Sequence, residues 1–273
     1  MGKINLHIGP HKTATTHLQI ILENSAFRDN TQYVPLWKVR ENVTDRYAAN
    51  EDPRDTSFLN YDDGLLLISE ENFSGFPLGG PRFYPRIKRY LGLFKDHETT
   101  VFFCPRNYAA FITSVYCEAL RFSEYFDFPN ITMQRGWIQV LEDVQEVLPN
   151  ATIKLWHFED YLSNWQAVVR YFSDDTVEKF GDPPSGDGRG QRRSTLSQKT
   201  VETYSALHQY VNNPNEVIEV LDNAMPTSVA FPRYSPFKAS KIEELTNKYH
   251  ADCEVLSQRY DVFSPAALQE QSA

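Results

Sequence analysis

The sequence is poor in cysteine and in positive charge. Its 273 residues include three cysteines, Cys104, Cys117 and Cys253, and no C-x-x-C pair, so neither a disulfide framework nor a zinc site is expected. Lysine and arginine number 27 against 36 acidic residues, which gives a net charge of −9. This acidic balance disfavours a general nucleic-acid binder. An anionic ligand would have to be held by a local cluster of positive groups.

Long apolar runs are also missing. No stretch of about 18 apolar residues occurs, so no membrane span is expected. The chain reaches only about five apolar-leaning positions before Gly9-Pro10, too few for the core of a signal peptide. With few cysteines and no such core, we expect a reducing, cytoplasmic setting.

What the sequence does contain is an alternation of strand-like and helix-like segments. Short apolar runs predict buried strands over Ile4–Gly9, Gly64–Ser69, Thr99–Cys104 and Thr152–His157. Helical periodicity predicts helices over Thr15–Asn24, Tyr108–Phe122, Met133–Leu148, Trp165–Phe172, Leu196–Val211, Asn215–Asn223 and Ser240–Arg259. Such alternation predicts a single α/β domain over 1–273, with three layers and a central, mostly parallel sheet flanked by helices.

Three stretches interrupt this pattern. Residues 30–60 are polar with weak periodicity, and we expect an irregular insert there. Phe73–Arg86 is dense in glycine, proline and aromatic residues, which suits a surface loop beside a ligand. Residues 181–195 form a glycine-rich loop that ends in positive charge, and we expect it to be mobile. Function should lie where such loops meet the carboxyl ends of the strands.

The most informative stretch follows the first predicted strand. The chain turns at Gly9-Pro10-His11, and Lys12-Thr13-Ala14-Thr15-Thr16 is predicted to open a helix. A strand followed by a helix start aims backbone N–H groups and the positive end of the helix dipole at one point, which makes an anion site. The spacing does not fit a Walker A loop, which needs a second glycine before the lysine, and no G-x-G-x-x-G occurs.

This loop closely resembles the 5′-phosphosulfate loop of sulfotransferases that use PAPS (3′-phosphoadenosine 5′-phosphosulfate), particularly the bacterial type with a G-x-x-K-T-G-T-T core. The resemblance implies a fold like that of P-loop NTPases. It also implies that PAPS is contacted by the loop residues His11, Lys12, Thr13, Ala14, Thr15 and Thr16. Ala14 stands where glycine is usual, and we expect alanine to fit the first helical turn.

A second match lies after the third predicted strand. In sulfotransferases an arginine at the end of this strand and a serine eight residues later hold the 3′-phosphate, and Arg106 and Ser114 have that spacing. Arginine offers a planar fork to phosphate oxygens, and serine offers a hydroxyl. The resemblance also implies a late basic loop over the 3′-phosphate, with Arg189, Arg192 and Arg193 as candidates.

The transfer reaction also needs a base. Glu70 and Glu71 follow the second predicted strand, and related bacterial and heparan-type sulfotransferases resemble this arrangement in using a glutamate. The comparison favours Glu71, with Glu70 second, while Lys12 resembles the lysine that stabilises the sulfate and the leaving oxygen. Histidine is the competing base in related enzymes. His11 and His157 are the candidates. We expect His11 to contact PAPS instead, and His157 to have a structural role.

These patterns predict an enzyme that moves a sulfuryl group from PAPS, with no metal, to a hydroxyl of an acceptor, and a carbohydrate or glycoconjugate is the acceptor class expected. Two alternatives stay open, a nucleotide-dependent phosphoryl transferase and a non-catalytic PAPS-binding protein. A phosphoryl transferase would bind its nucleotide with the same kind of anion-binding loop. This sequence, however, lacks a Walker A motif and a carboxylate beside the threonines that would hold Mg²⁺.

Overall fold

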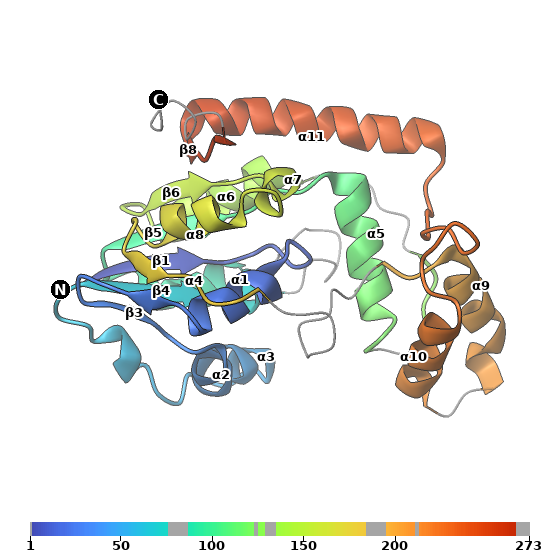
Figure 1. The fold of residues 1–273 in the computed structure, drawn as a ribbon, viewed down its shortest axis with the longest axis horizontal. Helices are drawn as coiled ribbons and strands as arrows, with labels where there is room; N and C mark the ends of the chain where they lie inside the picture. Colours follow the sequence, from blue (N-terminus) through green and yellow to red (C-terminus); the bar gives the residue numbers. More distant parts are fainter. Residues whose placement is uncertain are drawn as a thin grey trace. The chain divides into compact units, whose positions relative to one another are not determined.

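Buried apolar strands form a parallel sheet in the first of two units. The computed structural model describes residues 2–75, 87–122, 125–128, 135–183, 195–210 and 213–265. The first unit comprises Met1–Arg106, Gln134–Gln191 and Asp252–Ala273, and the second comprises Asn107–Met133 and Arg192–Ala251. The ribbon in Figure 1 shows the elements of each unit.

The sheet has the strand order β3-β4-β1-β5-β6-β8, and each neighbouring pair is parallel. Its strands are β1 (Lys3–His7), β3 (Thr31–Tyr33), β4 (Leu65–Ser69), β5 (Thr99–Phe103), β6 (Thr152–Leu155) and β8 (Asp261–Val262). The short strands β2 (Ala26–Phe27) and β7 (Val177–Lys179) pair antiparallel in a separate sheet. Because the main strands are parallel, their carboxyl ends share one edge, and β1 lies between β4 and β5 at that edge.

Helices cover both faces of the parallel sheet, as successive residues of β5 show. Phe102 packs edge-on against Phe172 of α8 (Trp165–Phe172), with ring centroids 5.0 Å apart. Phe103 packs against Trp137 of α6 (Trp137–Val147) at 5.5 Å. Because neighbouring side chains of a strand point to opposite faces, α8 and α6 lie on opposite sides of the sheet. The α/β fold class with three layers is therefore confirmed.

Other elements complete the first unit. They are α1 (Thr15–Glu23), α2 (Leu36–Val39), a π-helical turn (Arg40–Thr44), α3 (Asp45–Ala48), α4 (Ile87–Leu91), α7 (Phe158–Tyr161) and 3₁₀ turns at Ser57–Leu59, Glu71–Ser74 and Gly92–Phe94. The helix α1 packs on the same face as α8, where Leu18, Ile21 and Leu22 join a buried cluster with Leu67.

The second unit is helical. It contains α5 (Tyr108–Ala119), α9 (Gln198–Leu207), a 3₁₀ turn (His208–Tyr210) and α10 (Pro214–Ala224). Its buried cluster includes Tyr116, Leu120, Tyr204 and Ile218. The long helix α11 (Ala239–Arg259) begins in this unit, and its last turns belong to the first.

The predicted strands are all present, with ends that differ by a residue or two. The insert at 30–60 was expected to be irregular, but it supplies the edge strand β3 and the short helical turns of α2 and α3. These elements are too short for periodicity to indicate them. Within the part of the chain that the structure describes, no helix is both long enough and apolar enough to cross a bilayer.

Candidate functional site

The candidate site lies at the carboxyl edge of the sheet, where the loop after β1 is tied to its neighbours on both sides. The amide of Glu70 donates to the His7 carbonyl at 3.0 Å, and the amide of Ile8 donates to the Phe102 carbonyl at 3.1 Å. One step further, the Cys104 amide donates to the Gly9 carbonyl at 3.0 Å. These bonds fix the start of the loop between the ends of β4 and β5.

Carbonyl groups along the loop are turned toward the protein. The Ser74 hydroxyl donates to the Ile8 carbonyl, and the Thr13 hydroxyl donates to the Pro10 carbonyl at 2.5 Å. The Lys12 carbonyl accepts a bond from the Arg106 guanidinium. With its carbonyl oxygens engaged in this way, the loop can present N–H groups to an anion without carbonyl repulsion.

The backbone of the loop enters the left-handed region of φ at every second residue from Lys12 to Ala14. Lys12 and Ala14 both have φ of 62°, in the left-handed region, whereas Thr13 between them does not. Such alternation makes successive N–H groups converge into an anion-binding nest. The structure thus gives a conformational basis for the anion site that the sequence predicts here.

The prediction that Ala14 fits the first helical turn was wrong. The helix α1 begins at Thr15, and Ala14 is its N-cap with φ 62° and ψ 26°. A left-handed residue is costly for any side chain with a Cβ, because that atom approaches the following carbonyl oxygen. This cost is the physical reason why glycine is favoured at such a position.

Replacing Ala14 with glycine is therefore expected to leave the free energy of unfolding within about 0.5 kcal/mol of its original value. Relief of the left-handed strain offsets the lost methyl burial and the added freedom of the unfolded chain. Ala167 in α8 is the matched control, because both alanines are partly buried against the same cluster. There the change to glycine should cost about 1 kcal/mol. Urea unfolding of both variants measures the difference, and equal losses would contradict the left-handed assignment.

Threonine hydroxyls line the start of α1. Thr13 and Thr15 are buried, whereas Thr16 is exposed. Ala14 has no side-chain oxygen to cap the helix, and no side-chain cap bond is present at this end. The buried Thr15 Oγ1 has no hydrogen-bond partner among the residues described. A buried hydroxyl in this state costs free energy, so its position at an uncapped helix start fits an anion that supplies the missing partner.

Arg106 belongs to the same edge of the sheet. It follows β5, is 7% exposed, and stacks its guanidinium over the Phe158 ring at 4.3 Å. Together with the bond to the Lys12 carbonyl, this contact brings its positive charge to the loop after β1. Arginine carries five N–H donors, so the bond to the Lys12 carbonyl uses only part of its capacity.

The remaining phosphate candidates are less fully described. Ser114 lies in α5 of the second unit and is buried. Arg189, Arg192 and Arg193 lie outside the described residues, together with most of the loop at 181–195 and of Phe73–Arg86.

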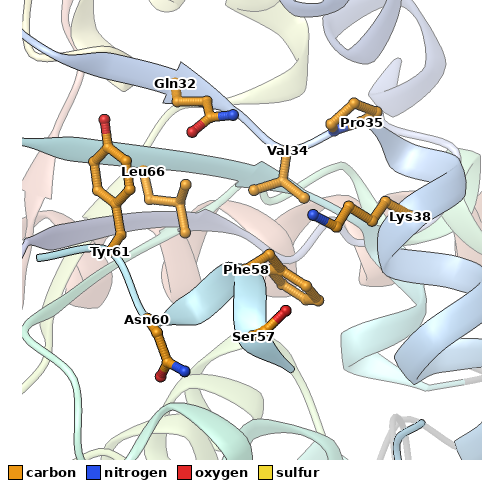
Figure 2. A pocket seen from close by; sticks show the side chains of 9 residues that line it. All are labelled: Gln32, Val34, Pro35, Lys38, Ser57, Phe58, Asn60, Tyr61 and Leu66. Carbon is orange, nitrogen blue, oxygen red and sulfur yellow. The ribbon is translucent and has the colours of Figure 1, made fainter. Parts of the chain in front are cut away.

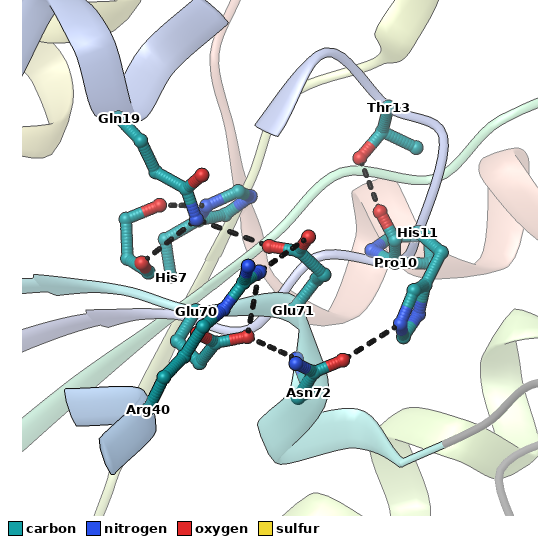
Figure 3. Close-up of polar contacts among 10 residues, drawn as sticks. His7, Pro10, His11, Thr13, Gln19, Arg40, Glu70, Glu71 and Asn72 are labelled. Carbon is teal, nitrogen blue, oxygen red and sulfur yellow. Dashed lines mark hydrogen bonds and ion pairs between the residues drawn. The ribbon is translucent and has the colours of Figure 1, made fainter. Parts of the chain in front are cut away.

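The two glutamates that follow β4 differ in exposure and share one arginine (Figure 3). The side chain of Glu70 is 0% exposed and that of Glu71 is 15% exposed. Arg40 Nε donates to Glu70 Oε2 at 2.7 Å, and Arg40 Nη2 donates to Glu71 Oε1 at 3.1 Å. Burial, followed by the charge of Glu71, raises the pKa of Glu70 to about 7, while the Arg40 guanidinium opposes that rise. Only Glu71 retains surface through which to meet a substrate.

Further side chains join the glutamates to the loop. Gln19 of α1 donates from Nε2 to Glu71 Oε2 at 3.0 Å. On the other side, the backbone N–H of Asn72 donates to Glu70 Oε1 at 2.9 Å. The side-chain Oδ1 of Asn72 lies 3.1 Å from His11 Nε2. His11 thus faces the glutamate segment from within the loop (Figure 3).

Sequence reasoning missed Arg40, Gln19 and Asn72. Arg40 is one charge among many in a polar segment, and Gln19 matches no motif. Asn72 directly follows the two glutamates, which is the one signal that could have singled it out.

The other histidines have structural surroundings. His7 is buried in β1 and stacks on Trp156 with ring centroids 4.9 Å apart, and burial lowers its pKa to about 3. His157 is the N-cap of α7, with Cys253 Sγ 3.7 Å from its Nδ1, and burial lowers its pKa as well. Within the described ranges, no group of histidine, cysteine and carboxylate side chains could hold a metal ion.

A cavity of about 220 Å³ lies beside β3, lined in part by Lys38, Phe58 and Leu66 (Figure 2). Its lining residues include neither Glu70 nor Glu71 nor any residue of the loop after β1. This cavity is therefore separate from the candidate site.

Comparison with known proteins gives a similarity to a solved structure and no match to a known sequence. No protein-family model matches the chain, and no curated protein matches it. Among solved structures, it is similar to a sulfotransferase from Alicyclobacillus acidocaldarius, with 13% sequence identity and a TM-score of 0.43. The match covers 79% of this chain and 95% of that one. Function has to be argued from this chain's own residues.

Proposed function

We propose that the protein is a sulfotransferase that moves the sulfuryl group of PAPS to a hydroxyl of an acceptor. One observation carries the proposal: the left-handed loop with its uncapped helix start lies directly against a partly exposed glutamate. A Cβ at Gly9 would lie 3.0 Å from the Cβ of Glu71, so these two residues are in backbone-close contact. An anion cradle and a base in contact are what sulfuryl transfer to a hydroxyl requires.

The loop would hold the phosphosulfate end of the donor. Its fit rests on the buried Thr15 hydroxyl that has no partner among the described residues, and on the alternating backbone at Lys12 and Ala14. N–H groups there would bond the sulfate and phosphate oxygens. Lys12 would add a full positive charge where negative charge grows on the departing phosphate oxygen.

Glu71 would accept the proton of the acceptor hydroxyl. The acceptor oxygen then forms a bond to sulfur while the bond from sulfur to the 5′-phosphate oxygen breaks, so that the products are a sulfate ester and PAP, the desulfated donor. The proton stays on the carboxylate until it reaches solvent. Glu70 is fully enclosed, and we assign it no contact with the acceptor.

Arg106 would bind the 3′-phosphate. The sequence motif adds Ser114 as a candidate, and the late loop adds Arg189 and Arg193. Support comes from the buried guanidinium of Arg106 at the same edge as the cradle. The acceptor class we propose is a carbohydrate or glycoconjugate, on the resemblance of the glutamate base to that of heparan-type enzymes.

Thermal unfolding with added ligands tests the donor site. PAP at one hundred times its dissociation constant should add about 2.7 kcal/mol to the free energy of unfolding, if it binds only the folded protein. ATP, ATP with Mg²⁺ and NAD serve as controls at equal concentration. Stabilisation by ATP with Mg²⁺ alone would replace the proposal with a phosphoryl transferase, and no response to PAP would refute a working donor site.

Transfer of radiolabelled sulfate from PAPS to a panel of carbohydrates then tests the reaction itself. Binding of PAP without transfer to any hydroxyl acceptor, including simple alcohols and phenols, would favour the non-catalytic alternative.

A further inference from the structure

We propose that Arg40 is a positioning residue for the Glu71 base, and that buried Glu70 serves to anchor Arg40 and balance its charge. This inference rests on the proposed function and adds to it a residue outside the loop, the strands and the phosphate motifs. The three side chains form a carboxylate–guanidinium–carboxylate cluster at the edge of the sheet (Figure 3).

The geometry of the guanidinium is the first argument. Arg40 contacts Glu70 through Nε at 2.7 Å and through Nη2 at 3.4 Å, so the planar group is held in a fork. The same Nη2 reaches Glu71 at 3.1 Å. Because the fork to Glu70 fixes the plane of the guanidinium, it also fixes the direction from which Glu71 is held.

Burial separates the roles of the two carboxylates. Glu70 is 0% exposed, and its Oε1 also accepts a hydrogen bond from the backbone N–H of Asn72 at 2.9 Å. It therefore faces protein on all sides and acts on Arg40. Glu71 keeps surface, and among the described residues each of its oxygens accepts one bond, Oε1 from Arg40 and Oε2 from Gln19. A carboxylate has about four lone-pair sites, so two such bonds orient Glu71 and leave capacity for a proton.

Charge supplies the third argument. A carboxylate beside a lone guanidinium binds a proton weakly, which makes a poor base. Here Glu70 supplies a second negative charge, so Arg40 can orient Glu71 without its full positive charge acting on that one group. Two other groups that face the cluster are Tyr33 of β3 and Asp45 of α3. The pKa of Tyr33 is raised first by burial and then by the charges of Glu23, Glu70 and Glu71.

The location of Arg40 fits such a role. It is the first residue of the π-helical turn Arg40–Thr44, directly after α2. Isolated π turns are rare and occur often at functional sites, because the extra residue redirects a side chain. The insert at 30–60 thus supplies a residue to the site.

The test uses the full chain with three variants, Arg40→Gln, Arg40→Lys and Glu70→Gln. Transfer from PAPS is followed against pH with the best acceptor of the carbohydrate panel, and PAP binding is followed by thermal shift. We expect kcat to fall about 10- to 100-fold in Arg40→Gln with KM for PAPS unchanged, because the base is displaced and the loop is not. Arg40→Lys should recover part of kcat, since it restores the charge without the fork.

The acidic limb of the pH profile gives the sharper readout. It should move to higher pH in Arg40→Gln, because two carboxylates then lack their cation. It should move to lower pH in Glu70→Gln, because Arg40 then acts on Glu71 alone. General damage to the fold does not shift the limb in opposite directions. A limb that stays in place in both variants would overturn the inference.

Two controls keep the test decisive. Arg40→Gln leaves a buried carboxylate without its cation and can prevent folding, so the double variant Arg40→Met/Glu70→Leu removes both charges together. It should bind PAP normally and keep the loss of kcat, and wild-type kcat in this double variant would overturn the inference. Arg46→Gln in α3, where Arg46 pairs with Glu51 at the surface, should leave kcat and the pH profile unchanged. Absence of PAP binding in the wild-type chain would instead refute the proposed function.

Discussion

Replacement of Lys12 by alanine is expected to lower kcat by about 10²–10³-fold, the scale of removing one group that stabilises charge in a transition state. The substitution removes the amine and keeps the backbone carbonyl, which accepts a bond from the Arg106 guanidinium. Alanine also occupies the left-handed region at a cost similar to that of lysine, so the backbone should keep its path. The measurement is the rate of PAP release from PAPS in the presence of the best carbohydrate acceptor.

Affinity for PAP should change much less than kcat, since loop N–H groups and Arg106 would still bind the phosphates. Lys95→Ala is the matched control, because Lys95 is exposed near the start of β5, at the opposite edge of the sheet. A Lys12→Ala variant with normal kcat would remove the lysine from the proposed mechanism.

The second large effect is expected for Glu71→Gln, which should lower kcat by about 10²–10⁴-fold, the range for loss of a general base. Glutamine keeps the shape of the side chain and can still accept a bond from Arg40 or Gln19. It cannot take up a proton, so the deficit should shrink as pH rises and hydroxide takes over that role. The measurement is kcat between pH 6 and pH 9 for both proteins.

Glu98→Gln serves as its control, because Glu98 is exposed and directly precedes β5 at the amino edge. Full activity in Glu71→Gln combined with a large loss in His11→Gln would transfer the role of base to the histidine. That outcome has a structural route, since His11 Nε2 lies 3.1 Å from Asn72 next to the glutamates.

The parts of the fold that sequence predicted are those that local pattern determines. Buried strands such as β4 and β5 are built around short apolar runs, and an amphipathic helix such as α6 has a strong helical period. The proximity of the loop after β1 to the end of β4 was also predictable from the sequence, because parallel strands bring their carboxyl ends to one edge of the sheet.

What escaped prediction depends on contacts between distant residues or on backbone conformation. Arg40 lies 30 positions from Glu70 in the chain, and nothing local distinguishes it from its neighbours. The left-handed state of Ala14 was missed because alanine is a good helix former, and the local propensity was overridden by the geometry of the loop. β3, three residues long, is a strand only because β4 lies beside it.

The close approach of Gly9 to Glu71 has a mechanical consequence. Two backbone segments in van der Waals contact, with no side chain between them, cannot slide apart without opening a void, and cannot move closer without a clash. The close packing therefore holds the backbone at Gly9 and the backbone at Glu71 at a fixed separation. A displacement of the loop would carry the backbone of Glu71 with it, while the bonds from Arg40 and Gln19 set the direction of the carboxylate itself.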